Sequence, residues 1–130
     1  MSTVLDASAL LAMLFAEPGA ETVADAIGDG AAASTVNISE VATVLVRHQR
    51  DAETILGRVC EQISVEPFTE RDAFGAAAMY PETASCGLSL GDRACLALAQ
   101  RLGVPALTAE HAWAEPTLGI EMRLIRPRSS

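Results

Sequence analysis

The segment TVLDASALLAMLFAEPG, residues 3–19, determines the fold that the sequence predicts. Its first three residues are a short β-branched and apolar run, typical of a buried strand, and Asp6 follows them directly. Residues 7–16 then have the composition of a helix, which Pro18 and Gly19 stop. A buried strand followed at once by a helix is the repeating unit of a parallel sheet.

The same alternation continues along the rest of the chain. Further helices are predicted at residues 20–27, from Asn37 to about 50, and at 51–63, 69–79 and 90–102, with a short helical turn at 110–114. Further strands are predicted at residues 32–36, around Val65, at 105–108 and at 122–125, with a loop at 81–89 and a frayed tail at 126–130. This order predicts one α/β domain over residues 1–130, with a central, mostly parallel sheet and helices on both faces.

Composition excludes several classes of protein. The three cysteines lack C-x-x-C spacing, so we expect a cytoplasmic protein without a disulfide framework or a zinc site. No apolar run is long enough to span a membrane, and the first residues do not resemble a secretory signal. The net charge of -8 argues against binding nucleic acid through bulk positive charge. All nine basic residues are arginines, which excludes chemistry that needs a lysine.

Four acidic residues lie at strand ends or helix starts, namely Asp6, Glu40, Asp92 and Glu110. Each of them alone also fits a capping role at the start of a helix or turn. Glu40 lies three residues after Asn37, and Asp92 lies three residues after Ser89, which is the spacing of a capping box. A structural role therefore remains an alternative for every one of these acids when it is considered singly.

Considered together, the four acids predict a metal site. The carboxyl ends of the strands in an open parallel sheet border one crevice, where ligands bind, so we expect the acids to converge there. Crowded carboxylates repel one another, and a divalent cation relieves that repulsion. Oxygen ligands suit Mg²⁺ or Mn²⁺, whereas zinc sites usually contain His or Cys. Ser8 and Thr108 are candidates to add hydrogen bonds at this site or to cap the nearby elements.

Four segments resemble motifs of the PIN-domain family, in the family's order. VLDASA at 4–9 is similar to its first strand and acid, NISEV at 37–41 to its second motif, LSLGDRACLALA at 88–99 to its third motif as found in VapC-type toxins, and LTAEHAW at 107–113 to its last motif. The sequence departs from the family pattern at Glu110, where the family usually has Asp. We therefore leave open whether Glu110 binds metal directly, through water, or not at all.

The resemblance implies a Mg²⁺- or Mn²⁺-dependent endoribonuclease toxin of a toxin–antitoxin pair, often a homodimer, that acts on structured RNA such as tRNA or rRNA. It implies that Asp6, Glu40, Asp92 and Glu110 hold the metal, which activates water for attack on the phosphate. Arg93, Arg47 and Arg50 are candidates to hold the RNA backbone. A cognate antitoxin is expected to bind in a groove between the first helix and the helix at residues 41–50. The first helix carries Leu10, Leu11, Leu14 and Phe15, which belong to the core or in part face this partner.

Other interpretations fit the sequence less well. A receiver domain or a haloacid-dehalogenase-like phosphatase needs an essential Lys, and the phosphatase also needs Asp where Ser8 stands. GDGAAA at 28–33 matches a dinucleotide-binding pattern, but it follows a predicted helix and precedes a strand, the reverse of the required order. The alternative that stays open is a PIN fold with weakened catalysis that acts as an RNA-binding or protein-interaction module.

Overall fold

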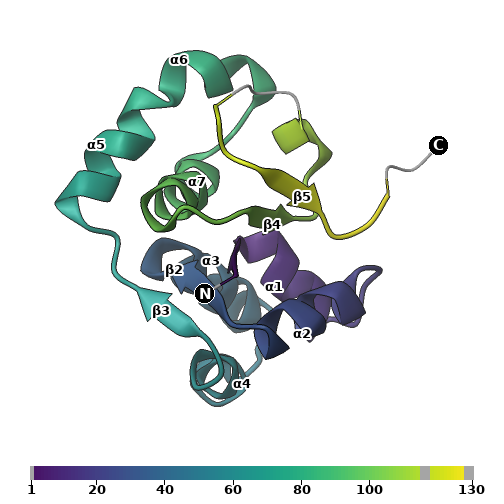
Figure 1. Cartoon of the computed structure of the whole chain (residues 1–130). Coiled ribbons are helices and arrows are strands. Elements are labelled where there is room, and N and C mark those ends of the chain that lie inside the picture. Colours follow the sequence, from purple (N-terminus) through teal and green to yellow (C-terminus); the bar gives the residue numbers. More distant parts are fainter. Residues whose placement is uncertain (1, 115–117, 128–130) are drawn as a thin grey trace.

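Residues 2–114 and 118–127 are described by a computed structural model of the chain (Figure 1). The strands are β1 (Thr3–Leu5), β2 (Ala31–Ser34), β3 (Ser64–Glu66), β4 (Ala106–Thr108) and β5 (Met122–Leu124). The helices are α1 (Ala7–Leu14), α2 (Ala20–Gly28), α3 (Thr35–Arg47), α4 (Ala52–Cys60), α5 (Glu70–Ala78), α6 (Tyr80–Thr83) and α7 (Leu90–Leu102), with 3-10 turns at Ala84–Cys86 and His111–Ala114. Within the described ranges, none of the helices combines the length and apolarity that crossing a membrane requires.

The five strands form one parallel sheet in the order β3-β2-β1-β4-β5, which confirms the predicted α/β fold. From β1 the chain adds β2 and β3 on one side, and it then adds β4 and β5 on the other. The direction of building therefore switches between β1 and β4, which pair through Val4 with Ala106 and Leu5 with Leu107. The crevice at the carboxyl ends of the two strands at such a switch point is where open α/β sheets bind ligands.

Strands β1, β2 and β4 are buried on both faces, as their short apolar sequences predict, whereas the edge strands β3 and β5 are partly exposed. Leu5 of β1 and Ala33 of β2 belong to a core shared with α1, α2, α3 and α4. Their neighbours Val4 and Ala32 belong to a second core with α5 and α7. Figure 1 shows the two groups of helices on opposite sides of the sheet, so both layers that the sequence predicted are present.

Helix α3 begins earlier than the sequence analysis predicted. Thr35 and Val36, predicted as the end of a strand, form its first turn. Ser34 is the N-cap, and its side chain accepts a hydrogen bond from the backbone N–H of Val36 at 3.2 Å. Asn37 is therefore inside the helix, and the capping box considered for Asn37 and Glu40 is absent because the helix starts three residues earlier.

Two other segments also differ from prediction. Residues 81–89, predicted as a loop, include most of α6 and the turn Ala84–Cys86. Pro81 lies in the first turn of α6, where a missing backbone N–H costs nothing.

At the start of the predicted tail, the Arg126 guanidinium donates to the Pro18 carbonyl at 3.0 Å and pairs with Glu17, so Arg126 is held in place. Residues 128–130 of that tail lie outside the described residues.

A buried ion pair joins α5 to α7. Arg101 Nε donates to Asp72 Oδ1 at 2.9 Å, and Arg101 Nη2 donates to Asp72 Oδ2 at 3.1 Å. The Asp72 side chain also completes a capping box with Thr69, the N-cap of α5. Because Asp72 is only 3% exposed and its partner binds it through two nitrogens, this pair is of the kind that contributes to stability.

Replacing Asp72 with Ala should lower the free energy of unfolding by about 1–3 kcal/mol, because it leaves Arg101 only its longer pair with Glu66 at 3.8 Å and removes one half of the capping box of α5. Urea denaturation followed by circular dichroism measures the change. Glu121→Ala is the control, since its pair with Arg123 is exposed and should be worth less than about 1 kcal/mol. Equal effects of the two substitutions would contradict a structural role for the buried pair.

Candidate active site

Asp6 lies at the carboxyl end of β1 and is 1% exposed. Its Oδ1 accepts hydrogen bonds from the Ala9 backbone N–H at 2.8 Å and from the Ser8 hydroxyl at 2.8 Å. Its Oδ2 accepts from the Thr108 hydroxyl at 2.6 Å. Asp6 therefore caps α1, as the alternative interpretation proposed, and at the same time links β1 to the end of β4.

The protonation of Asp6 is strongly perturbed. The pKa of Asp6 is raised from 3.8 to about 7, mainly because the carboxyl group is buried. Hydrogen bonds from Thr108, Ala9 and Ser8 lower this pKa, and the negative charge of Asp92 raises it slightly. No arginine in the described ranges forms an ion pair with Asp6. The carboxylate is thus supplied with hydrogen-bond donors but has no protein cation to balance its charge.

Glu40 lies in the second turn of α3, and its carboxylate extends over the start of α7. Asn37 Nδ2 donates to Glu40 Oε1 at 2.8 Å and to the Gly91 carbonyl at 3.0 Å. A Cβ atom built on Gly91 would lie 2.2 Å from Glu40 Oε2. The Glu40 carboxylate therefore occupies the space that a side chain at position 91 would fill.

Asp92 is the third residue of α7 and forms a capping box with Ser89. The Ser89 backbone N–H donates to Asp92 Oδ2 at 2.8 Å, and the Asp92 backbone N–H donates to the Ser89 hydroxyl at 3.2 Å. One turn further along α7, burial raises the pKa of the Cys95 thiol well above its usual value, and the charges of Asp6, Asp92 and Glu40 add to that effect. The charges of these three carboxylates all act on one buried thiol, and Glu40 lies against Gly91, which precedes Asp92. That Asp6, Glu40 and Asp92 hold one metal ion stays a prediction.

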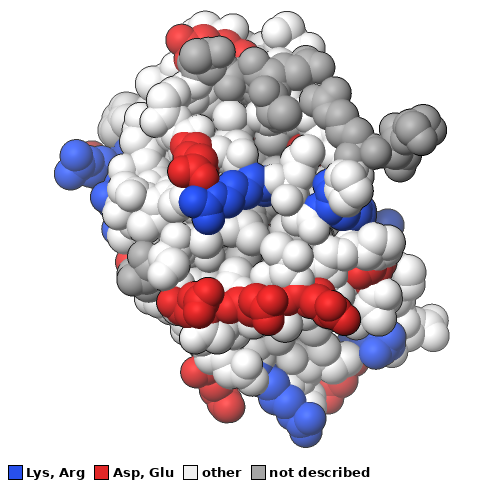
Figure 2. Space-filling view, turned by 45° about the vertical axis from the view of Figure 1, so that its right-hand side comes forward, with Lys and Arg blue, Asp and Glu red and all other residues white. Residues whose placement is uncertain are grey.

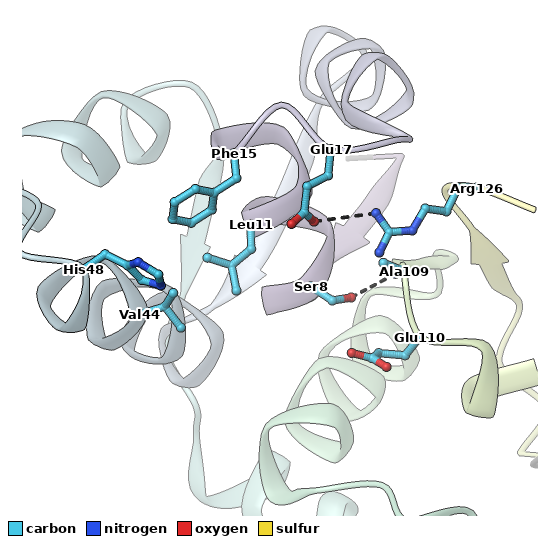
Figure 3. Close-up of a pocket in the computed structure, with 9 residues that line it drawn as sticks. All are labelled: Ser8, Leu11, Phe15, Glu17, Val44, His48, Ala109, Glu110 and Arg126. Carbon is cyan, nitrogen blue, oxygen red and sulfur yellow. Dashed lines mark hydrogen bonds and ion pairs between the residues drawn. The ribbon is translucent and has the colours of Figure 1, made fainter. Parts of the chain in front are cut away.

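Glu110 follows the end of β4 by two residues. Its side chain is exposed, and its backbone N–H donates to the Thr108 hydroxyl at 2.9 Å. Figure 3 shows the Glu110 side chain on the segment after β4, near Ser8, at one end of a groove. Ser8 supports this corner as well as Asp6, because its hydroxyl accepts from the Ala109 backbone N–H at 2.9 Å. Ser8 and Thr108 therefore form hydrogen bonds both with the Asp6 carboxylate and with the backbone that follows β4.

The groove is about 400 Å³ in volume and runs between α1 and α3. Leu11 of α1 and Phe15 just after this helix form one wall. Val44 of α3 and His48 just after that helix form the other (Figure 3). The other residues that line the groove are Ser8, Glu17, Ala109, Glu110 and Arg126. The groove therefore combines apolar side chains with polar ones, and it leads from the end of β4 toward the exposed ends of α1 and α3.

The three candidate arginines are placed differently. Arg47 lies beside Glu40 in a shallow depression along α3. The Arg50 guanidinium lies 6.0 Å from the centre of the Phe15 ring. The Arg93 guanidinium lies 5.5 Å from the Tyr80 ring centre and donates to the Ala76 carbonyl at 3.0 Å, so it is directed toward α5 and α6. On the face drawn in Figure 2, arginines are scattered singly, while acidic side chains form a row.

The chemistry of the donor set fits a hard divalent cation. In the described ranges, no three His, Cys, Asp or Glu side chains are close enough to form a finished metal cage. Mg²⁺ does not need such a cage, because it usually binds through one or two carboxylates and keeps several waters. Asp6, Glu40 and Asp92 supply carboxylate oxygens only, and the buried charge of Asp6 has no protein cation beside it. These residues suit Mg²⁺ or Mn²⁺ better than Zn²⁺.

Fold and site together define an α/β protein with acidic side chains gathered at the switch point of a parallel sheet. A family model described as the PIN domain matches residues 3–116 of this chain. The chain therefore belongs to the PIN-domain family, as the resemblance of its four motifs predicted. Among curated protein sequences, a search finds no significant match.

Several solved structures share this fold at low sequence identity. The structure of VapBC2 from Rickettsia felis bound to a DNA fragment from its promoter aligns with a TM-score of 0.76 and 11% identity, over 95% of this chain and 98% of that one. VapC20 from Mycobacterium tuberculosis, described as a sarcin-ricin loop cleaving toxin, aligns with a TM-score of 0.71 and 18% identity, over 92% and 99% of the two chains. FitAcB from Neisseria gonorrhoeae aligns with a TM-score of 0.66 and 16% identity, over 92% and 95%.

Sequence reasoning missed two residues that shape this site. Asn37 was considered only as the start of a helix, although its amide contacts both Glu40 and the first turn of α7. Gly91 was quoted only as part of a motif, although the space above it holds the Glu40 carboxylate. A signal for Gly91 was available, because glycine is unfavourable inside a helix and needs another reason to be there.

Replacing Asp6 with Asn should stabilise the metal-free protein, and the gain should grow with pH. The pKa of Asp6 is about 7 in the folded chain, against 3.8 without the fold, so folding takes up a proton between these values. Wild type therefore loses stability as pH rises through that window, by up to about 1.4 kcal/mol per pH unit, whereas Asp6→Asn does not. Urea unfolding in EDTA at several pH values measures the difference, which should level off above the folded pKa.

Asp51→Asn provides the control for this pH series. Hydrogen bonds, first of all from the Thr54 hydroxyl, lower the pKa of the exposed Asp51, so its charged form stabilises the fold. The stability of wild type relative to Asp51→Asn should therefore increase as pH rises through the acidic range. This change is opposite in sign to the one expected for Asp6→Asn. A difference between wild type and Asp6→Asn that is independent of pH would contradict a raised pKa for Asp6.

Proposed function

We propose that the protein is a metal-dependent endoribonuclease toxin of a toxin–antitoxin pair that cuts structured RNA such as tRNA or rRNA. The observation that carries this proposal is the placement of three acids near the switch point of the sheet. Asp6 ends β1 and accepts a hydrogen bond from Thr108 at the end of β4, and Glu40 lies against Gly91, which precedes Asp92. Membership of the PIN-domain family supports it. A similar fold in a toxin described as cleaving the sarcin-ricin loop is consistent with an RNA substrate. The homodimer that the resemblance implies remains a prediction.

In this proposal Asp6, Glu40 and Asp92 hold Mg²⁺ or Mn²⁺, and Glu110 lies at the margin of the site. When bound, the metal supplies Lewis acidity to the scissile phosphate and to the attacking water. Ser8 and Thr108 keep the Asp6 carboxylate in one orientation through their hydroxyl donors. Water attack at phosphorus with departure of the 3′ oxygen leaves a 5′-phosphate and a 3′-hydroxyl.

Arginines at the rim are proposed to contact the RNA backbone. Arg47 is best placed, because it is exposed and lies in the same depression as Glu40. Arg50 lies over Phe15 at the far end of the groove, and Arg93 must leave Tyr80 and the Ala76 carbonyl before it can bind phosphate. With a net charge of -8 the chain offers little bulk attraction for RNA, so affinity should depend on the metal and on these few arginines.

Cleavage of purified tRNA and rRNA by antitoxin-free protein tests the activity. Wild type should make discrete cuts with Mg²⁺ or Mn²⁺ and none in EDTA. Asp6→Asn and Asp92→Asn should each lose at least about 100-fold in rate, because loss of a supporting residue alone often costs 10–100-fold at metal sites. Asp51→Asn, at the exposed start of α4, should cut as wild type does. Cutting that persists in EDTA or in both site variants would contradict the proposal.

We further propose that the antitoxin binds the groove between α1 and α3. Leu11, Phe15 and Val44 offer an apolar surface there, and Ser8 and Glu110 connect it to the proposed active site. Several structures that share the fold are described as toxin–antitoxin complexes, which supports a partner of this kind. An antitoxin segment with apolar side chains along one face would fit the groove and could extend toward the acidic residues.

Val44→Arg tests this placement, because it puts a charged side chain on the α3 wall of the groove. Affinity for the cognate antitoxin should fall at least about 10-fold, since an unpaired charge is costly in an apolar interface. The matched control is Val46→Arg on the same helix, where Val46 is 63% exposed and lies outside the groove lining. Titration of labelled antitoxin measures both affinities. A loss for Val46→Arg with none for Val44→Arg would place the antitoxin elsewhere.

A further inference from the structure

Asn37 is a buried polar residue that the proposed reaction leaves without a role. Its side chain is 1% exposed, and its Nδ2 donates to Glu40 Oε1 at 2.8 Å and to the Gly91 carbonyl at 3.0 Å. Both partners are acceptors, so only the NH₂ group can face them, and the amide has one possible orientation. The two donors of Asn37 therefore connect a carboxylate of α3 to the backbone of α7.

The other half of the same amide has no partner. Asn37 Oδ1 is buried and accepts no hydrogen bond from any of the described residues. A buried acceptor without a donor reduces stability, and an apolar side chain at this position would avoid that cost. Stability alone therefore does not explain Asn37, and the two bonds made by its NH₂ group must account for it.

Gly91 is the second part of the same arrangement. A Cβ atom at this position would lie 2.2 Å from Glu40 Oε2 and 2.3 Å from Glu40 Oε1, closer than real atoms approach. Gly91 does not have the positive φ that favours glycine, and alanine is a better residue inside a helix. The reason for glycine is thus the space that the Glu40 carboxylate occupies over the first turn of α7.

We propose that Asn37 and Gly91 are positioning residues that set where the Glu40 carboxylate lies relative to Asp92. Asn37 draws Glu40 Oε1 toward α7, and Gly91 leaves room for the carboxylate next to the residue that precedes Asp92. This inference rests on the proposed function, in which Glu40 and Asp92 hold the same metal ion. It predicts that metal affinity depends on two residues that supply no ligand themselves.

Mn²⁺ affinity of the full chain, measured by electron paramagnetic resonance, tests the proposal. Gly91→Ala should fold as wild type does, because Glu40 can swing aside, but it should bind Mn²⁺ at least about 10-fold more weakly, as other supporting residues do. Asn37→Ala should show a similar loss, and Glu40→Gln gives the reference loss of the carboxylate charge itself. Gly57→Ala is the matched control, since a Cβ atom there meets nothing within 4 Å. It should bind Mn²⁺ as wild type does.

A second measurement needs neither metal nor RNA. The side-chain amide signals of Asn37 in a ¹⁵N spectrum are identified by their loss in Asn37→Ala. They should shift in Gly91→Ala and in Glu40→Gln, because both substitutions change the acceptor at Nδ2, and they should stay in place in Gly57→Ala. Unchanged Asn37 signals in Gly91→Ala would overturn the proposed geometry.

The outcomes separate this inference from the nuclease proposal. Suppose that Gly91→Ala and Asn37→Ala bind Mn²⁺ more weakly but wild type cuts no RNA. This result would support the positioning role and contradict the proposed ribonuclease activity. Wild-type Mn²⁺ affinity in Gly91→Ala would overturn the positioning role even if wild type cuts RNA. No Mn²⁺ binding by wild type, or full binding by Glu40→Gln, would overturn both.

Discussion

The burial of a carboxylate at the end of the first strand is the constraint on which the rest of the structure depends. Asp6 is 1% exposed, and a carboxylate in that environment needs hydrogen-bond donors close by. Its donors come from both sides, with Ser8 and Ala9 in α1 and Thr108 at the end of β4. The start of α1 and the pairing of β1 with β4 are therefore tied to one side chain, at the point where the sheet changes its direction of building.

Structural and chemical roles coincide at this site. Asp6 caps α1 and Asp92 caps α7, so both carboxylates stabilise the helices that bring them to the site. Helix N-termini favour negative charge, which offsets part of the repulsion between acids placed close together. Glu40 has no such role, because it lies beyond the first turn of α3. Its carboxylate is held instead by the side-chain amide of Asn37 and occupies the space above Gly91.

Much of this arrangement could be predicted from the sequence, and the limits have physical causes. Strand–helix alternation predicted the parallel sheet, which the structure confirms, whereas the metal site of Asp6, Glu40 and Asp92 stays a prediction. The predicted start of α3 was wrong because Ser34 and Asn37 are both favourable N-cap residues. Which of them caps the helix depends on where strand β2 ends, and β2 ends at Ser34. Contacts across elements were not predictable, since no local pattern shows that Gly91 lies beneath Glu40 or that Arg93 stacks on Tyr80.

The central claim is that the three acids form one cation site, and anomalous diffraction tests it most directly. Crystals of the protein soaked in Mn²⁺ would be measured near the manganese absorption edge, with an identical soak of Asp6→Asn for comparison. The account predicts one strong anomalous peak between Asp6, Glu40 and Asp92 that disappears in the variant. A peak elsewhere on the molecule, or a peak that remains unchanged in Asp6→Asn, would contradict it.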